Sequence, residues 1–297
     1  MSRVTLSGEA TVIQLCSLFE VSRAAYYAAR RPDGAPKVVL LRPRSARPGT
    51  VGAPEWKAAI EAVVAKRPAW GHRKVWATVR RQGLKVGRRR VYEMMRTLNL
   101  LLPATHEGRV PRPRGHVTTA EPNRRLATDL TTVWTRNDGL VAIAITVDCG
   151  CRSVLDVTAT KSQESPAVLG SVERSLVIAF KSPAGVPEGV ELRSDHGPQY
   201  TGSDAAALAK RWNLEQTFAP VGRPTGNAVA ERTIQTMKLE CIWLEDFDGV
   251  EDLQAALDEW QGCFNHERPH QSLDWATPWE RRCERLGLPL PTRAEAS

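Results

Sequence analysis

Apolar and polar positions in the second half of the chain follow the patterns of strands and helices in turn. Residues 125–135 alternate and are rich in Thr and Val, residues 139–150 form a nearly continuous apolar run, and residues 152–160 give a third such segment. These segments predict three strands, and the Asn-Asp-Gly sequence at 137–139 predicts a hairpin turn between the first two. The elements predicted beyond them are a helix at 162–180, a strand at 190–195, a helix at 204–213, a strand at 214–219 and a long helix at 226–244.

The first half of the chain is predicted to be helical. Residues 12–30 carry two short amphipathic segments on either side of Ser22, a good N-cap, and predict a helix-turn-helix unit or, equally well, a plain helical hairpin. Three further apolar stripes at helical spacing lie between residues 55 and 100, and the last stripe begins with three consecutive arginines. Because a recognition helix presents its N-terminal residues to the major groove, this region is predicted to bind DNA as a helix-turn-helix-type domain.

These patterns divide the chain into six predicted segments. Two stretches rich in Pro, Gly and Arg are typical of linkers and separate the folded parts. Three antiparallel strands followed by alternating helices and strands is the element order of a ribonuclease-H-like fold. The predicted class is therefore α/β, with a ribonuclease-H-like core preceded by an all-helical, helix-turn-helix-type region. The segments are a helical N-terminus at 1–30, a linker at 31–54, the basic helical domain at 55–102, a second linker at 103–124, the core with C-terminal helices at 125–285 and a tail at 286–297.

Charge is divided unevenly between the two halves. Of the 41 Lys and Arg residues, 25 lie in the first 125 residues beside only 8 Asp and Glu, a net charge of +17. The remainder carries a net charge of −9, so the total is +8. A strongly basic module favours a polyanionic partner, because neutralising phosphates releases counterions. A merely solvated basic surface would give the same count.

The composition also indicates a cellular setting. The six cysteines form no C-x-x-C pair, and His72, His106 and His116 have no cysteines at ligand spacing, so no structural zinc is expected. The N-terminus lacks the order of a signal peptide, and no apolar run approaches the length of a membrane span. We therefore expect a reduced, cytoplasmic chain.

Three carboxylates stand where the predicted elements do not explain them. Asp129 lies inside an apolar strand, Asp195 ends a strand, and Glu231 lies near the start of a helix with 35 residues between it and Asp195. Oxygen ligands of this kind suit Mg²⁺, with Mn²⁺ as a substitute, and two such ions can bind both the attacking and the leaving oxygen of a phosphodiester. Ordinary caps or ion pairs are the better explanation for four other aspartates, Asp138, Asp148, Asp156 and Asp204, of which Asp148 is the reserve candidate because it also ends a strand.

With these residues in place, the chain resembles the OrfB-type transposases, or integrases, of bacterial insertion sequences, whose core is related to retroviral integrase. The similarity covers most of the chain, and its motifs occur in the family's order with the 35-residue spacing. The matching strings are WGHRK at 70–74, ATDLT at 127–131, SDHGPQYT at 194–201, GNAVAERTIQTMK at 226–238 and NHERPHQSL at 265–273.

The resemblance implies a role for particular residues. Asp129, Asp195 and Glu231 become the catalytic carboxylates, which bind two metal ions. Lys238, seven residues after Glu231, contacts the terminal DNA. Without the motif, Lys238 would be taken for an ordinary surface lysine. The basic residues expected to contact DNA from the helical domain are Arg73, Lys74, Arg88, Arg89 and Arg90.

The predicted function is that of a DNA transposase that performs metal-dependent strand cleavage and strand transfer. The partners implied are the element ends and the target as duplex DNA, further copies of the chain on that DNA, and an upstream-frame DNA-binding protein or fusion. A DNA-binding regulator without catalysis is the alternative, against which the intact set of carboxylates argues. A nuclease for RNA–DNA hybrids is a third hypothesis. The basic helical domain and the RPH segment argue against it, because such a nuclease is not expected to carry them.

Overall fold

The computed structural model describes residues 54–103, 121–219 and 227–290, together with the single residues 16, 19, 21 and 119. The described ranges from residue 54 onward belong to one structural unit. The helices expected within 1–30 and the linker at 31–54 lie outside the described residues, apart from isolated positions, as do most of the linker at 103–124 and the end of the tail. No helix in the described part of the chain is both long and apolar enough to cross a membrane.

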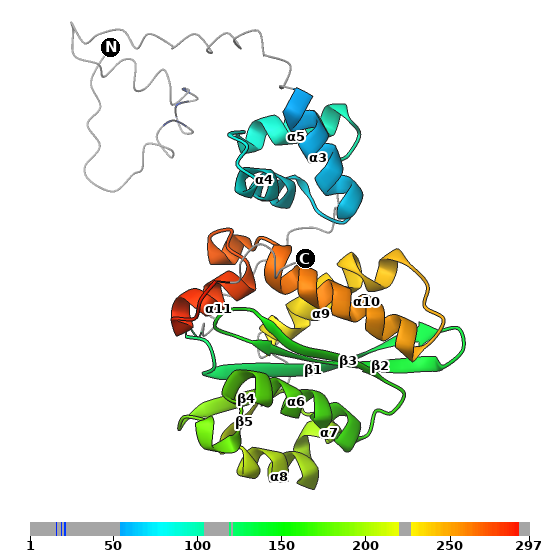
Figure 1. Cartoon of the computed structure of the whole chain (residues 1–297), viewed down its shortest axis with the longest axis vertical. Coiled ribbons are helices and arrows are strands. Elements are labelled where there is room, and N and C mark those ends of the chain that lie inside the picture. The colour runs from blue at the N-terminus through cyan, green and yellow to red at the C-terminus, as the bar shows by residue number, and fades with distance from the viewer. Residues whose placement is uncertain are drawn as a thin grey trace, which may run out of the picture. The chain divides into compact units, whose positions relative to one another are not determined.

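A five-stranded sheet forms the centre of the α/β domain, with strand order β3-β2-β1-β4-β5 (Figure 1). The hairpin predicted from the Asn-Asp-Gly turn is confirmed, because β1 pairs antiparallel with β2 from Leu126 opposite Asp148 to Thr135 opposite Gly139. β3 pairs antiparallel with β2, whereas β4 and β5 run parallel to β1 and to each other. The strands span β1 Arg125–Thr135, β2 Gly139–Asp148, β3 Val154–Thr160, β4 Val190–Ser194 and β5 Leu214–Phe218.

Helices cover both faces of this sheet (Figure 1). On one face, α6 and α8 bury a cluster that includes Leu126, Val172 and Leu208, and on the other, α9 and α10 bury one that includes Ile143, Met237 and Leu257. Burial on both faces explains why β2 is a continuous apolar run rather than an alternating one. The helices are α6 Ser165–Phe180, α7 Pro198–Thr201, α8 Ser203–Arg211, α9 Ala228–Glu240, α10 Val250–Gly262 and α11 Pro278–Leu286, with short turns of helix η1 Pro183–Gly185, η2 Ile242–Leu244, η3 Cys263–Glu267 and η4 Gln271–Leu273.

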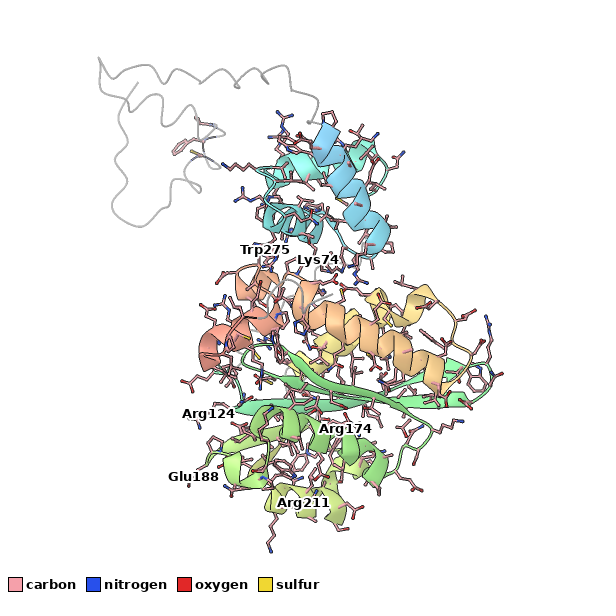
Figure 2. All side chains as sticks on the ribbon, viewed as in Figure 1. Lys74, Arg124, Arg174, Glu188, Arg211 and Trp275 are labelled. Carbon is pink, nitrogen blue, oxygen red and sulfur yellow. The ribbon has the colours of Figure 1, made fainter. Side chains whose placement is uncertain are left out.

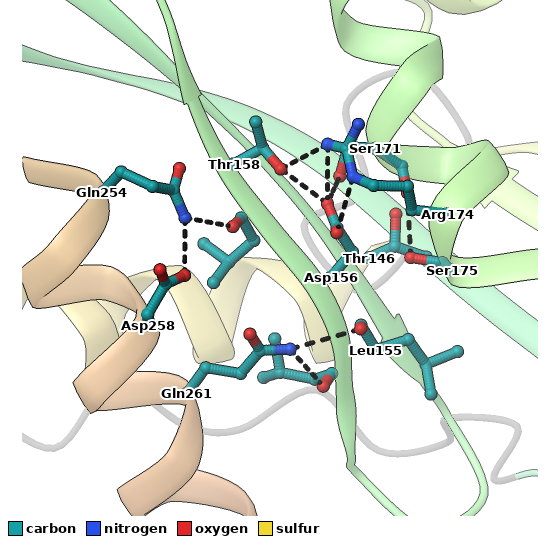
Figure 3. Close-up of polar contacts among 12 residues, drawn as sticks. Thr146, Leu155, Asp156, Thr158, Ser171, Arg174, Ser175, Gln254, Asp258 and Gln261 are labelled. Atoms are coloured by element: carbon teal, nitrogen blue, oxygen red, sulfur yellow. Dashed lines mark hydrogen bonds and ion pairs between the residues drawn. The ribbon is translucent and has the colours of Figure 1, made fainter. Parts of the chain in front are cut away.

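Polar contacts join β3 to the helix on each side of it (Figure 3). Asp156 accepts hydrogen bonds from Thr158 (2.8 Å) and Ser171 (2.5 Å) and pairs with Arg174 on α6 (3.0 Å). On the other side, Gln261 of α10 donates to the backbone carbonyl of Val154 (3.0 Å). Asp156 therefore has the structural role expected of it from the sequence.

The long helix predicted at 226–244 is shorter than expected. The α-helix ends at Glu240, where Cys241 adopts φ −138° and ψ −70°, and a 3-10 turn at Ile242–Leu244 follows. Apolar positions continue beyond Glu240, and Ile242 is buried. The sequence pattern therefore gives no sign that the α-helix ends at Glu240.

Three helices form the region before the sheet: α3 Pro54–Lys66, α4 His72–Arg81 and α5 Arg88–Thr97. The three predicted stripes supply its interior, which includes Ile60, Val75 and Met95, all with 1% or less of their surface exposed. Both α4 and α5 begin after a glycine, Gly71 and Gly87, and neither has a side-chain cap. We call residues 54–103 the helical module below.

Candidate active site

Two of the predicted carboxylates lie where β1 and β4 separate. The first three residues of β1 pair in parallel with residues 191–193 of β4, and the last pair is Ala127 opposite Arg193. Asp129 and Asp195 each stand two residues beyond this pair. Because the offsets are equal, the register of the strands brings both carboxylates to the point where the sheet opens.

Asp129 is the most perturbed of the three carboxylates. Burial raises its pKa to about 6, and the charges of Asp195 and Glu231 add to the rise. A hydrogen bond from the backbone N–H of Leu130 (2.8 Å) and the charge of Lys238 oppose this shift. The charges of Asp195, Glu231 and Lys238 therefore all act on Asp129.

The loop that follows Asp195 is fixed by short-range hydrogen bonds. Asp195 Oδ1 accepts from the backbone N–H of Gly197 at 2.9 Å. A Cβ added at Gly197 would lie 3.0 Å from both Asp195 Oδ1 and Gln199 Oε1. Glycine at this position therefore avoids a steric clash with the carboxylate of Asp195. Tyr200 then places its hydroxyl 3.3 Å from Thr128 Oγ1, which links the loop to β1 beside Asp129.

Helix α9 supplies Glu231 and Lys238 on one face. Asn227, the residue before the helix, donates from Nδ2 to the backbone carbonyl of Thr128 (3.0 Å) and so fixes the start of α9 against β1. Glu231 is exposed, and its pKa is raised by partial burial. Lys238 follows two turns later, which returns it to the same side of the helix. The polar partners of the site, Thr128, Tyr200 and Asn227, were not predicted as a set, because no sequence spacing relates them.

The donor set at this site suits a hard divalent cation. Carboxylate oxygens are the ligands that Mg²⁺ prefers, and a cation would relieve the repulsion that Asp129 experiences from Asp195 and Glu231. Within the ranges described above, no three His, Cys, Asp or Glu side chains are gathered closely enough to hold a metal ion. Binding a cation would therefore have to draw the three carboxylates together.

Asp148, the reserve candidate, ends β2 beside the beginning of β1, where it stands opposite Leu126. Its side chain is fully buried and pairs with Arg282 (3.0 Å), which is only 3% exposed. It also accepts from the backbone N–H groups of Asn123 (2.7 Å) and Gly150 (2.8 Å). Asp129 pairs with Ile145, three residues before Asp148, and the charge of Asp148 is taken up by Arg282, so Asp148 is a structural ion-pair partner. Asp138 is structural too, pairing with Lys161 (2.6 Å).

The basic residues of the helical module fall into two groups. Arg88, Arg89 and Arg90 are exposed at the start of α5, with Arg89 paired to Glu93 (2.9 Å). His72, at the start of α4, contacts Tyr92 of α5 with ring centroids 5.1 Å apart, so the starts of α4 and α5 lie close together. Burial and the charges of Arg73 and Arg88 lower the pKa of His72.

Lys74 is directed elsewhere. Its ammonium lies 2.5 Å from Glu240 at the end of α9, and only 25% of its side chain is exposed. Its charge is thus occupied within the protein, so we do not include it among the proposed DNA contacts. Arg73 is exposed and reaches Gln271 from Nη1 at 3.4 Å, so it remains among them.

Comparison with known families identifies both parts of the chain. Residues 119–224 and 213–278 match models described as the integrase core domain, and residues 55–107 match a model described as an HTH-like domain. The chain is 27% identical over 238 residues to the transposase InsD for insertion element IS2A/D/F/H/I/K of Escherichia coli, covering 74% of this chain and 76% of that one. The transposase InsD for insertion element IS2D of Escherichia coli (strain K12) gives the same values. The chain therefore carries an HTH-like domain followed by an integrase core domain, and it is homologous to the InsD transposases of insertion elements.

This assignment confirms the fold and the class of function predicted for the transposase from its sequence. Among solved structures, the simian T-cell lymphotropic virus intasome in complex with PP2A regulatory subunit B56 gamma aligns with a TM-score of 0.48 and 19% identity, covering 76% of this chain and 77% of that one. The HTLV-2 integrase catalytic core domain in complex with magnesium aligns with a TM-score of 0.40 and 15% identity, covering 55% of this chain and 97% of that one.

Proposed function

We propose that Asp129, Asp195 and Glu231 are the catalytic carboxylates of this transposase and that they hold two Mg²⁺ ions. The observation that carries the proposal is that Asp129 and Asp195 each stand two residues beyond the last pair of β1 with β4, while Asn227 fixes the start of α9, which carries Glu231, against β1. Burial and the charges of Asp195 and Glu231 raise the pKa of Asp129 to about 6. Carboxylates whose charges disfavour the ionised form of a buried neighbour, as at Asp129, are typical of a functional site. Mn²⁺ would replace Mg²⁺, since both take oxygen ligands.

The bound cation would supply a lowered pKa for the attacking oxygen and stabilisation for the leaving oxygen of a phosphodiester. The side chains of the transposase do the rest. Asp129 and Asp195 present their oxygens from a rigid sheet, and Glu231 presents its oxygens from a helix fixed to β1 through Asn227. Lys238, on the Glu231 side of α9, positions a phosphate of the DNA end without reading a base.

The substrate is duplex DNA, which the helical module binds through the surface that includes Arg73 and the three arginines at 88–90. Attack of water on a phosphodiester at an element end breaks the P–O3′ bond and frees a 3′-hydroxyl. Attack of that hydroxyl on a phosphate of a second DNA forms the new P–O bond and displaces the 3′-oxygen of that strand, which leaves as a 3′-hydroxyl. Joining an end to a target requires two DNA segments in one complex, so we expect several copies of the chain to assemble on the DNA.

The test uses single isosteric variants of the full-length transposase with duplex DNA that carries the ends of its own element. We expect Asp129→Asn, Asp195→Asn and Glu231→Gln each to reduce Mg²⁺-dependent cleavage to background while DNA affinity stays near wild type. Asp204→Asn, an exposed aspartate in the first turn of α8, is the matched control and should cleave normally. Substantial cleavage by any of the three variants would remove that residue from the site.

A further inference from the structure

Glu240, the last residue of α9, is shared between the α/β domain and the helical module. Arg268, which follows η3, binds it through two bonds, from Nε to Oε2 and from Nη2 to Oε1, both 2.8 Å. Lys74 of α4 approaches Oε1 at 2.5 Å, and Trp70 donates from its indole N–H to Oε2 at 3.3 Å. One carboxylate thus holds two groups of the module and one of the α/β domain.

This contact is buried, unlike the ion pairs around it. The side chains of Glu240 and Arg268 are 8% and 10% exposed. The neighbouring pair of Lys66 with Glu267 is 62% and 34% exposed, which makes it weak because solvent screens it. A buried, two-bond arginine–carboxylate pair is stronger and geometrically specific.

The charges at Glu240 are consistent with this arrangement. Burial opposes ionisation of Glu240, but hydrogen bonds and charge from Arg268, together with Lys74, outweigh it and lower the pKa of the carboxyl. Burial and the nearby Arg268 lower the pKa of Lys74, an effect that Glu240 only partly offsets. Glu240 therefore stays ionised, and it remains paired with Arg268 when Lys74 is removed.

Apolar contacts accompany the polar ones. Cys263 of η3 packs into the apolar interior of the helical module, beside Trp70. Trp76 of α4 contacts Trp275 edge to face, with ring centroids 5.4 Å apart. Lys74 and Trp275, both labelled in Figure 2, mark this contact region.

Glu240 and the proposed site residues lie on opposite faces of α9. At about 100° per residue, the nine residues from Glu231 to Glu240 turn the side chain to the opposite face of the helix. Lys238, at seven residues, stays on the Glu231 face. One rigid helix therefore presents Glu231 and Lys238 toward the site on one face and its anchor for the helical module on the other.

We propose that Lys74 and Trp70 are positioning residues, which tie the helical module to α9 through Glu240 so that DNA bound by the module meets the carboxylates at a fixed distance. The proposal builds on the proposed function of the three carboxylates. It gives Lys74 a role different from the DNA contact expected from the sequence. Removing its charge should leave DNA binding unchanged if Lys74 ties the module to α9 and should weaken it if Lys74 contacts DNA.

The test compares Lys74→Met with Lys57→Met in the full-length chain. Methionine keeps the apolar stem of the lysine without its charge, and Lys57 is an exposed lysine of α3. For Lys74→Met we expect the Kd for end-bearing duplex DNA and its salt dependence to stay at wild-type values. We expect cleavage at saturating DNA to slow by about 3- to 30-fold, the range for loss of one coupling contact. Lys74→Arg, which keeps the pair, should recover most of the rate, and Lys57→Met should match wild type.

Hydrogen exchange provides a readout that does not depend on catalysis. In Lys74→Met, amides in α4 and in the last turn of α9 should exchange faster, while those within α6 are unchanged. If Lys74→Met instead weakens DNA binding and flattens the salt slope by about 1, Lys74 contacts phosphate and the proposal is wrong. Unchanged exchange in α4 and α9 would also overturn it. If wild type shows no metal-dependent cleavage, the proposed function fails, and the exchange data still decide whether Lys74 ties the module.

Discussion

Replacing Asp129 by Asn should stabilise the protein in the absence of metal, although it removes a proposed catalytic group. Asn keeps the shape of the side chain and an oxygen that can accept from the backbone N–H of Leu130. It removes the charge that burial, Asp195 and Glu231 all disfavour. The folded protein then no longer contains the least favourable of the three negative charges.

The size of this effect follows from the pKa of Asp129, which lies at about 6 in the folded chain against an ordinary value of 3.8. Because the folded state binds the proton more tightly, the wild type loses stability as the pH rises from about 4 through 6 and loses nothing further above that window. The variant lacks this loss. Its advantage in free energy of unfolding should be about 1 kcal/mol at pH 4.5 and reach a plateau of about 3 kcal/mol by pH 8.

Urea unfolding of wild type and variant at several pH values between 4.5 and 8, with EDTA present, measures this difference. Mg²⁺ should stabilise the wild type and leave Asp129→Asn nearly unaffected, which shrinks the gap, because a ligand stabilises only the state that binds it. Asp204→Asn serves as the control for loss of one negative charge. A difference between wild type and Asp129→Asn that stays constant across this pH range would refute the reasoning.

Three further outcomes are expected. Replacing the three arginines at 88–90 by Ala should flatten the dependence of log K on log salt by roughly 1 to 3 units in a DNA-binding titration. Each phosphate contact contributes about 0.9 to this slope. An unchanged slope would mean that these arginines do not contact DNA. Lys238→Ala should slow strand transfer at saturating Mg²⁺ more than Lys238→Arg does, because Arg keeps the positive charge. Metal binding should stay near normal in both variants. Equal rates for both variants and the wild type would show that Lys238 is an ordinary surface residue. Asp148→Ala should destabilise the fold by about 3–5 kcal/mol in urea unfolding, because it leaves the guanidinium of Arg282 buried without its partner; a loss below about 1 kcal/mol would contradict the structural role.

Much of the fold could be predicted from local patterns. The hairpin of β1 and β2 follows from alternation around a turn sequence, and the three helices of the module follow from apolar stripes that close on one interior. The end of α9 at Glu240 could not be predicted in the same way, because the buried Ile242 continues the apolar pattern through a break in the backbone.

The partner of a charged residue was the hardest feature to predict. Lys74 and the arginines at 88–90 look alike as basic residues of one helical region, and nothing local to either segment distinguishes them. The difference arises from Glu240, which is 166 residues from Lys74 in sequence and binds Lys74 rather than the three arginines. A charge count therefore predicts a basic module but not which of its cations are available to DNA.

The separation of β1 from β4 explains why two aspartates 66 positions apart form one site. Parallel strands carry their C-terminal ends to the same edge of a sheet, and ligands bind there when neighbouring strands part. Here the pairing stops at Ala127 and Arg193, so Asp129 and Asp195 lie just beyond the last shared hydrogen bonds. Asp148 also ends a strand, but its strand is antiparallel, and the same geometry sends it to the other edge. The parallel register of β1 and β4 joins segments 66 positions apart and is encoded by no local pattern, and it decides that Asp129 and Asp195 lie beyond the same end of the pairing.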